Sequence, residues 1–254
     1  QIKASRRAYF ANISYLDDKI GEILDVLEMT GQEATILFVS DHGDMLGERG
    51  LWFKMSFFEG AARVPLMIAA PEMAPGVVTA PVSTIDICPT LCNLAGISMA
   101  EVMPWTHGES LVPLASGGAR RQAVAMEYAA EASYAPLVSL CSGWWKYIRC
   151  ALDPEQLFNL ETDPHELCNL ASNPQYAKIL QDLRDQSHAL WDLDRFDAEI
   201  RESQARRWVI YEALREGGYY PWDYQPLQTA SERYMRNHMD LNALEAKKRV
   251  PKRT

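Results

Sequence analysis

An amphipathic helix followed at once by a short apolar strand is the feature that most limits how this chain can fold. Apolar residues recur at the three- and four-residue spacing of one helix face: Tyr9, Ile13, Leu16, Ile20, Leu24 and Leu27. Thr30-Gly31 ends the pattern. After a short polar link, residues 35–39 (Thr-Ile-Leu-Phe-Val) form a predicted buried strand. A helix that leads into a strand indicates a layered α/β fold.

A polar tetrad, Ser40-Asp41-His42-Gly43, directly follows this strand. It places a carboxylate and an imidazole at the edge where open α/β sheets bind their ligands. Because a loop does not force neighbouring side chains apart, Asp41 and His42 can both reach one divalent cation. Oxygen and imidazole ligands suit calcium, magnesium or manganese better than a structural zinc. The alternative is a strand-end cap beside a core histidine, but the glycine-rich, acidic loop that follows favours the metal.

Lys54 lies 13 residues after Asp41 and is flanked by the apolar residues 51–53 and 55–58. We expect its ammonium to emerge from a partly buried wall, although an isolated lysine is most often a solvated surface residue. A desolvated lysine is normally paired with an anion. A metal, a lysine and a strand end together predict hydrolysis of a charged ester.

The rest of the chain alternates predicted strands and helices. The expected elements are a strand at 64–70, a helix from Ser83 to Leu94, a strand at 122–128, a hairpin of 137–141 and 145–150 around Ser142-Gly143, a helix carrying Tyr176, Leu180, Leu183 and Leu190, and a helix at 206–216. Residues 153–160 and 163–170 show turn chemistry. Trp144, Trp145 and Trp191 are predicted core residues.

Composition excludes some classes of function. The net charge of −9 argues against a nucleic-acid-binding surface. No apolar stretch approaches the roughly 20 residues needed to span a bilayer, so we expect no membrane partner. Five cysteines form no paired framework. We therefore expect free, mostly buried thiols and a cytoplasmic protein. The acidic net charge fits a protein that handles a small molecule.

Two carboxylates, Glu127 and Glu131, lie at the end of a predicted strand and close to Tyr128 and Tyr134. Carboxylates combined with aromatic faces are how proteins hold a quaternary ammonium, which has no N–H to donate. The alternative is that these are ordinary surface residues.

From Gly217 onward the sequence is aromatic and interrupted by proline, and it ends in a basic segment. A tail this aromatic is costly to leave in water, so we expect it to pack against another surface. A neighbouring subunit is the expected surface, which predicts a homo-oligomer.

Three segments together carry a resemblance to a known family: residues 15–21, the run from Ser40 to Lys54, and Arg63-Val64-Pro65-Leu66. They resemble the sulfatases of the alkaline phosphatase superfamily, and residues 157–160 and 163–170 look like the C-terminal subdomain of that family. The tail, at 221–228 and 232–238, narrows the resemblance to the choline-sulfatases.

The resemblance implies the C-terminal part of an alkaline-phosphatase-like sandwich. Residues 1–120 would belong to its α/β core, 121–216 to a small antiparallel-sheet subdomain, and 217–254 to an extended tail. The implied reaction is hydrolysis of choline O-sulfate to choline and sulfate. Asp41 and His42 would complete a metal site, calcium or alternatively manganese, and Lys54 would bridge the sulfate and the leaving-group oxygen. Glu131, with Glu127 behind it, would face the trimethylammonium group. Acidic residues of the tail, Asp240 or Glu245, would reach the cation pocket of a neighbouring subunit.

One departure from the family pattern concerns the nucleophile. The family's formylglycine is made within a Cys-x-Pro-x-Arg context, and none of the five cysteines has this context. We therefore expect the nucleophile and the other metal carboxylates before Gln1, in an N-terminal half of the same enzyme, and we expect this chain alone to be inactive. The alternatives are a phosphonate monoester or phosphodiester hydrolase, since those hydrolases share a histidine at the position of His42, and a non-catalytic assembly lobe.

Overall fold

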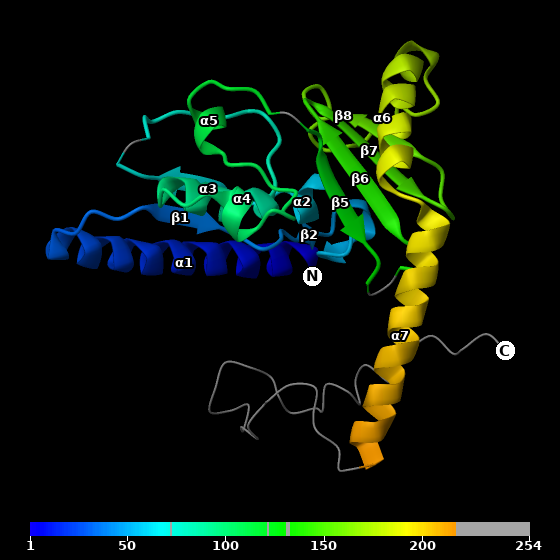
Figure 1. Ribbon diagram of the computed structural model, residues 1–254, viewed down its shortest axis with the longest axis horizontal. Helices are drawn as coiled ribbons and strands as arrows, with labels where there is room; N and C mark the ends of the chain where they lie inside the picture. Colours follow the sequence, from blue (N-terminus) through cyan, green and yellow to red (C-terminus); the bar gives the residue numbers. More distant parts are fainter. Residues whose placement is uncertain (72, 121, 131–132, 217–254) are drawn as a thin grey trace. The chain divides into compact units, whose positions relative to one another are not determined.

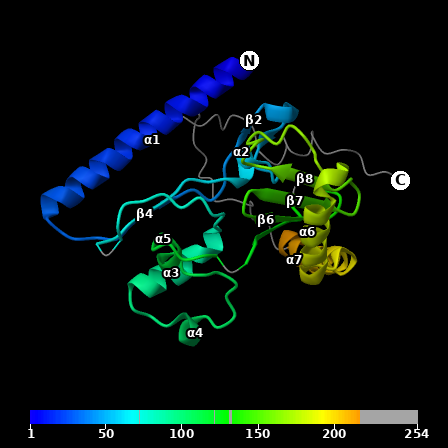
Figure 2. The same ribbon diagram turned by 90° about the horizontal axis from the view of Figure 1, so that it is seen from above.

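The computed structural model describes residues 1–71, 73–120, 122–130 and 133–216. The chain divides into two units, Gln1–Ile200 and Arg201–Thr254, and each is described by itself. Within the described ranges, no helix is long and apolar enough to cross a membrane. Most elements of the first unit are labelled in Figure 1, and β4 is labelled in Figure 2.

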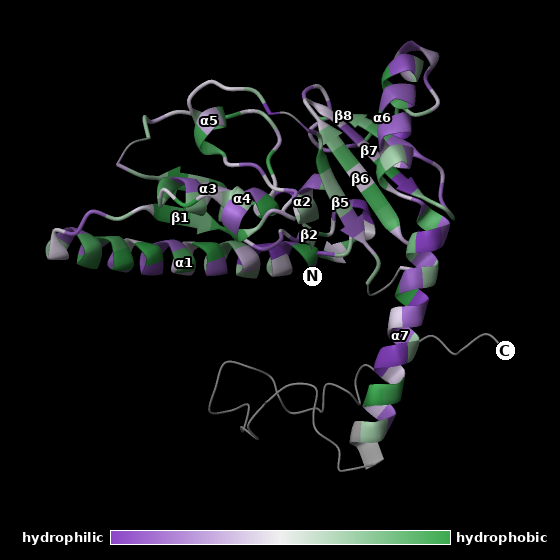
Figure 3. Ribbon diagram, in the orientation of Figure 1, coloured by the Kyte–Doolittle hydropathy of each residue, from purple (hydrophilic) through white to green (hydrophobic). Residues whose placement is uncertain are grey.

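The first helix, α1 (Ile2–Thr30), confirms the predicted amphipathic helix. It ends at Gly31, which adopts the left-handed conformation with φ of 63° and donates its N–H to the carbonyl of Glu28. None of the residues of α1 is buried, and Phe10 and Leu16 are each more than half exposed. Figure 3 shows apolar and polar residues alternating along the helix. In the described chain, α1 therefore carries an apolar face that is only partly covered, with Tyr9, Ile20 and Leu27 half-buried.

Two short sheets surround the polar tetrad. Strands β1 (Ile36–Val39) and β4 (Leu66–Ala69) pair antiparallel, with Val39 opposite Leu66. Strands β2 (Met45–Leu46) and β3 (Trp52–Phe53) form a second pair, joined by a 3-10 turn at Glu48–Gly50. The prediction that β1 is buried is wrong in this structure, because all four of its residues are only half-buried. A two-stranded sheet with no fully packed face cannot bury them.

A four-stranded antiparallel sheet forms the centre of the later part of the first unit. Its order is β5 (Val124–Tyr128), β6 (Leu137–Ser142), β7 (Trp145–Cys150) and β8 (Gln156–Asn159). Gly143 forms the turn of the β6–β7 hairpin with φ of 55°. These strands confirm the predicted hairpin and the small antiparallel sheet, and Figure 2 shows them lying side by side from above.

Helix α6 (Ala177–Leu190) covers one face of this sheet. Side chains alternate between the two faces along a strand. The apolar side chains on the face toward α6 pack against apolar side chains of α6 and of the residues after it. The buried members are Val138, Leu140, Tyr147, Leu157, Leu180, Leu183, Trp191 and Leu193. This is the main apolar core of the described chain.

The opposite face of the sheet packs against the segment that follows β3. Phe57 is buried there with Ile148 and Phe158, and its ring meets that of Tyr128 edge to face at 6.5 Å. Helix α2 (Glu59–Ala62) begins directly after this part of the chain, two residues after Phe57. The sheet is therefore covered on one face by α6 and on the other by the segment that leads from the polar tetrad.

The segment between β4 and β5 consists of short helices: α3 (Ile87–Leu94), α4 (Met99–Val102) and α5 (Val112–Ala115). Ser83 and Asp86 form a capping box at the 3-10 turn Thr84–Asp86, as their predicted position at the start of a helix suggests. The fully buried Asp86 is paired with Arg120 at 2.6 Å. This pair ties the end of the segment to its beginning.

Other sequence predictions have mixed outcomes. Helix α7 (Leu193–Glu216) starts earlier than the predicted helix at 206–216. Trp191 is buried, but the prediction that Trp144 is a core residue is wrong, because it is 43% exposed beside the hairpin turn. The thiols are free as predicted but not mostly buried, since only Cys141 is buried and two others are exposed.

The ion pair between Glu155 and Arg184 generates a prediction about pH. The hydrogen bonds of Arg184 hold the pKa of the Glu155 carboxyl below its usual value, and the Tyr147 hydroxyl adds to this. A depressed pKa means that the pair stabilises the fold fully above the unfolded pKa of about 4.3 and less as the pH falls through the folded pKa. We expect Glu155→Gln to lower the free energy of unfolding by about 1 kcal/mol at pH 7.

Urea unfolding at pH 7 and pH 4 measures this effect. The difference between the wild type and Glu155→Gln should shrink at pH 4, whereas the exposed control Glu161→Gln should show no such trend. A difference for Glu155→Gln that does not depend on pH would contradict the prediction.

Candidate functional site

Asp41 and His42 lie together directly after β1. His42 Nε2 is 3.6 Å from Asp41 Oδ2. Two donor atoms at right angles, each about 2.4 Å from one cation, are about 3.4 Å apart. The two side chains therefore have the separation of neighbouring ligands on a single ion.

The imidazole of His42 is held in one orientation by the backbone. Its Nδ1 lies 2.9 Å from the carbonyl oxygen of Gly43, which can only accept. In the neutral ring Nδ1 therefore carries the proton, and Nε2 has the lone pair. A histidine that donates Nδ1–H to a backbone carbonyl is prepared to bind a metal through Nε2.

The carboxylate of Asp41 is held in its ionised form. Its Oδ1 accepts the backbone N–H of His42 at 2.9 Å, and this bond is the main reason that the pKa of Asp41 lies below its usual value. The side chain is 85% exposed, so its second oxygen is accessible to a cation. The pair thus offers one anionic oxygen and one neutral nitrogen.

These two ligands alone do not make a metal site. Among the residues that the structure describes, no group of three or more His, Cys, Asp or Glu side chains could hold an ion. Glu48, which adds charge to the loop, is engaged elsewhere: it accepts the N–H of Leu46 at 2.6 Å and pairs with Arg6 of α1 at 2.8 Å. The donor set of Asp41 and His42 fits part of a divalent cation site, and a complete site would need further ligands.

Helix α2 supports the loop that carries the pair. Gly43 donates its N–H to the carbonyl of Ala61 at 2.8 Å. A Cβ on Gly43 would overlap the carbonyl oxygen of Gly60, so only glycine allows this close approach. The residue after His42 therefore rests directly on α2.

Lys54 follows β3, whose last residue, Phe53, has φ of 68°. The expected partly buried wall around Lys54 is found only in part: Lys54 is exposed, and Phe53 and Met55 beside it are 64% and 41% exposed. In the same stretch Trp52 is half-buried, and Phe57 and Phe58 pack against the sheet. Lys54 is free to meet an anion that approaches from outside the described chain.

Glu127 is occupied by a structural contact. The indole N–H of Trp191 donates to its Oε1 at 2.6 Å. Glu127 pairs across the sheet with Val138, which faces α6, whereas Phe57 packs on the opposite face. The structure therefore does not bring Glu127 together with the segment that carries Lys54. The other three residues expected to bind the cationic group, Glu131, Asp240 and Glu245, lie outside the described residues.

Sequence patterns missed a buried charge cluster beside α2. Lys146 is fully buried and pairs with Glu166 at 2.9 Å and with Glu59. Glu166 belongs to the segment at 163–170, whose predicted turn chemistry is confirmed by the bond from the Cys168 N–H to Asp163. The alternation of the hairpin strand identifies the face on which Lys146 lies, but nothing local identifies its partners.

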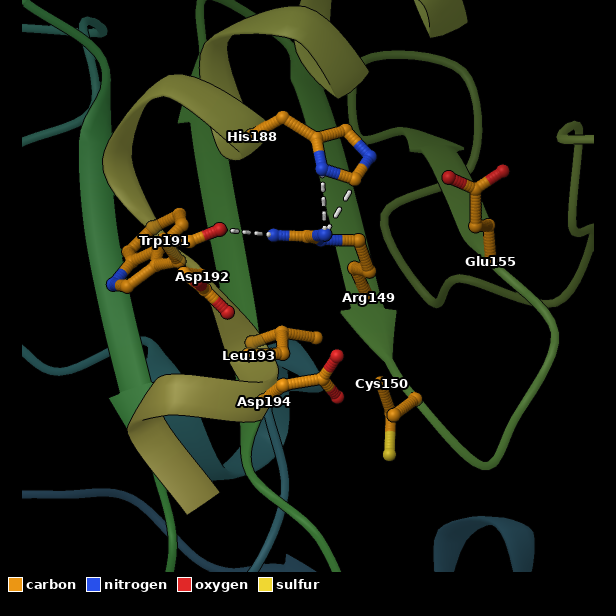
Figure 4. A pocket seen from close by; sticks show the side chains of 9 residues that line it. Arg149, Cys150, Glu155, His188, Trp191, Asp192, Leu193 and Asp194 are labelled. Carbon is orange, nitrogen blue, oxygen red and sulfur yellow. Dashed lines mark hydrogen bonds between the residues drawn. The ribbon is translucent and has the colours of Figure 1, made fainter. Parts of the chain in front are cut away.

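A cavity of about 560 Å³ opens on the α6 side of the sheet (Figure 4). Arg149 crosses it and bonds the carbonyl of Trp191 at 3.0 Å and His188 Nδ1 at 3.0 Å. Neither Asp41, His42 nor Lys54 lines this cavity. Its Glu155 is paired with Arg184, and its Arg149 bonds His188 and the backbone of Trp191, so the cavity does not enlarge the candidate site.

Comparisons of the sequence with known proteins give two family matches. Residues 47–192 match the family described as N-sulphoglucosamine sulphohydrolase, C-terminal, and residues 198–250 match choline sulfatase enzyme C terminal. A choline-sulfatase of Rhizobium meliloti (strain 1021) is 64% identical over 99% of this chain and 50% of its own length. Arylsulfatase K of Danio rerio is 37% identical over 72% of this chain and 36% of its own length. The chain thus spans half or less of the length of these relatives.

Solved structures share the fold. BT4656, in complex with its substrate D-glucosamine-2-N,6-O-disulfate, superposes with a TM-score of 0.60 at 25% identity, covering 70% of this chain and 38% of that one. A phosphonate monoester hydrolase from Silicibacter pomeroyi superposes with a TM-score of 0.58 at 30% identity, covering 68% of this chain and 38% of that one. The predicted α/β architecture with a small antiparallel subdomain is therefore confirmed.

Proposed function

Because the chain belongs to the sulfatase family, we propose that it forms the C-terminal half of an enzyme that hydrolyses sulfate esters, with choline O-sulfate as the substrate. The observation that carries the proposal is the Asp41–His42 pair, whose free oxygen and nitrogen lie 3.6 Å apart. The 64% identity to a choline-sulfatase supports the choice of substrate.

Asp41 and His42 would hold a divalent cation, calcium or alternatively manganese, together with ligands from the N-terminal half of the enzyme. A formylglycine in that half would supply the hydroxyl that attacks sulfur, and the cation held by Asp41 and His42 would neutralise charge on the sulfate oxygens. Asp41 contributes a carboxylate that remains ionised at neutral pH, because its pKa lies below the usual value. His42 contributes Nε2, because its Nδ1 proton is already donated to Gly43.

Lys54 would donate from its ammonium to the leaving-group oxygen as the S–O bond breaks. That oxygen gains negative charge in the transition state, and a fixed cation beside it lowers the barrier. The exposure of Lys54 and of Phe53 and Met55 next to it is consistent with a substrate pocket completed by other residues. The exposed apolar residues of α1 also support an association with the N-terminal half of the enzyme. Burying these residues against that half would stabilise the assembly.

The trimethylammonium group of the substrate would face carboxylates. Glu131, Asp240 and Glu245 remain the candidates, and Asp240 and Glu245 would come from a neighbouring subunit. Glu127 is no longer one of them, because its carboxylate holds Trp191 on the α6 side of the sheet.

A second candidate function is hydrolysis of phosphonate monoesters. The phosphonate monoester hydrolase noted above has a fold similar to that of this chain. The same metal pair and lysine would serve either reaction, because both transfer an anionic group from a leaving oxygen.

The first test compares substrates and removes the lysine in the whole enzyme. We expect kcat/KM for choline O-sulfate to exceed that for an aryl phosphonate, and Lys54→Ala to lower kcat about 100-fold or more. Lys178→Ala, which removes an exposed lysine of α6, is the matched control and should keep wild-type kcat. A preference for the phosphonate would favour the second function, and an unchanged kcat in Lys54→Ala would contradict the role of Lys54.

The second test concerns the tail. We propose that residues 217–254 make a contact between subunits, as their aromatic composition suggests. Truncation after Gly217 should shift the enzyme to a smaller species in size-exclusion chromatography. An unchanged elution volume, after correction for the lost mass, would contradict this proposal.

A further inference from the structure

The ammonium of Lys146 lies fully buried on the face of β7 that is turned toward α2. Its Nζ donates to the carbonyl of Phe57 at 2.8 Å, to Glu166 Oε1 at 2.9 Å, and to the carboxylate of Glu59. All three N–H groups of the ammonium therefore have an acceptor. Burial by itself lowers the pKa of Lys146, but the nearby negative charges, Glu59 first, outweigh it and hold the pKa above its usual value.

Glu166 completes a clamp on the first residue of α2. It is 2% exposed, has φ of 54°, and accepts the backbone N–H of Glu59 through Oε2 at 2.7 Å. Its two oxygens thus bind Lys146 on one side and the backbone of α2 on the other. Both the side chain and the backbone of Glu59 are fixed by groups from the later part of the chain.

The other side of α2 holds the loop of the candidate metal ligands. Gly43, next to His42, donates to the carbonyl of Ala61 and lies against Gly60. The segment that leads into α2 carries Lys54, five residues before Glu59. A four-residue helix therefore connects the charge cluster to both parts of the site.

Stability alone is a weak reason for this cluster. Taking one ammonium and two carboxylates out of water costs several kcal/mol per ion, and well-packed apolar residues often hold such a contact equally well. Phe57 and Phe158 already pack between the same two segments. The charges add a fixed orientation. The hydrogen bonds of the Lys146 ammonium are directional, so they hold Phe57 and Glu59 in one position relative to the sheet.

We propose that Lys146 and Glu166 are positioning residues of the sulfatase site, which fix α2 and, through it, hold Asp41, His42 and Lys54 in their working geometry. This inference rests on the proposed function. Neither residue touches the substrate or the metal. Their effect passes through the backbone of Glu59, Gly60 and Ala61.

The test uses the whole enzyme with Lys146→Met and Glu166→Gln. The second change is the milder one: it keeps the shape of the side chain but can place an amide NH2 against the N–H of Glu59. The control is Glu155→Gln, which breaks a partly buried ion pair on the α6 side of the same sheet. Two quantities are measured: kcat and KM for choline O-sulfate, and the affinity for Ca²⁺ or Mn²⁺, whichever the wild type binds more tightly, by titration calorimetry.

We expect both cluster variants to lower kcat and to weaken cation binding by about tenfold or more each, the range seen when the support of metal ligands is removed. KM should change less than kcat, and Glu155→Gln should change neither kcat nor cation affinity although it also removes an ion pair from the same sheet. Cation affinity is measured without turnover, so it reports on positioning even if the substrate assignment is wrong.

Cluster variants that lose stability but keep both kcat and cation affinity within twofold of the wild type would overturn the inference. If Lys146→Met fails to fold, Glu166→Gln decides the matter. A wild-type enzyme that hydrolyses neither sulfate nor phosphonate esters would instead overturn the proposed function. In that case the cation affinities measured by calorimetry would still test the role of Lys146 and Glu166.

Discussion

The buried contact of Lys146 with Glu59, Glu166 and the carbonyl of Phe57 is the interaction on which the rest of this structure depends. It joins the four-stranded sheet to the segment that leads away from the polar tetrad. One face of that sheet is closed by α6 mainly through apolar packing, with partly exposed polar contacts such as Glu155–Arg184 beside it. The other face combines Phe57 with charges, so it is fixed in position as well as buried.

Much of the fold could be predicted from the sequence because the relevant patterns are local. The apolar spacing of α1, the glycine that ends it, and Ser142-Gly143 between two apolar runs each depend on a few neighbouring residues. The order of Asp41 and His42 after a strand predicted a ligand pair, and the structure brings their donor atoms within 3.6 Å. The local pattern predicted hydrolysis of a charged ester, and the family resemblance narrowed this prediction to a sulfate ester.

What could not be predicted depends on contacts between distant parts of the chain. Glu59 bonds Glu166 across 107 positions and Lys146 across 87, so no spacing rule reveals them. Glu127 was expected near a substrate cation, but strand alternation turns it toward Trp191, 64 positions away. Lys54 was expected in a partly buried wall, but Lys54 and its immediate neighbours Phe53 and Met55 are exposed in the described chain.

Amide hydrogen exchange at Gly43 in the whole enzyme tests the central claim most directly, because its N–H is the bond by which α2 holds the metal-ligand loop. In Lys146→Met, exchange at Gly43 should accelerate about tenfold or more, while the amides of β6 keep their protection. Unchanged exchange at Gly43, with acceleration confined to residues 57–62, would contradict the claim that the charge cluster controls the site through α2.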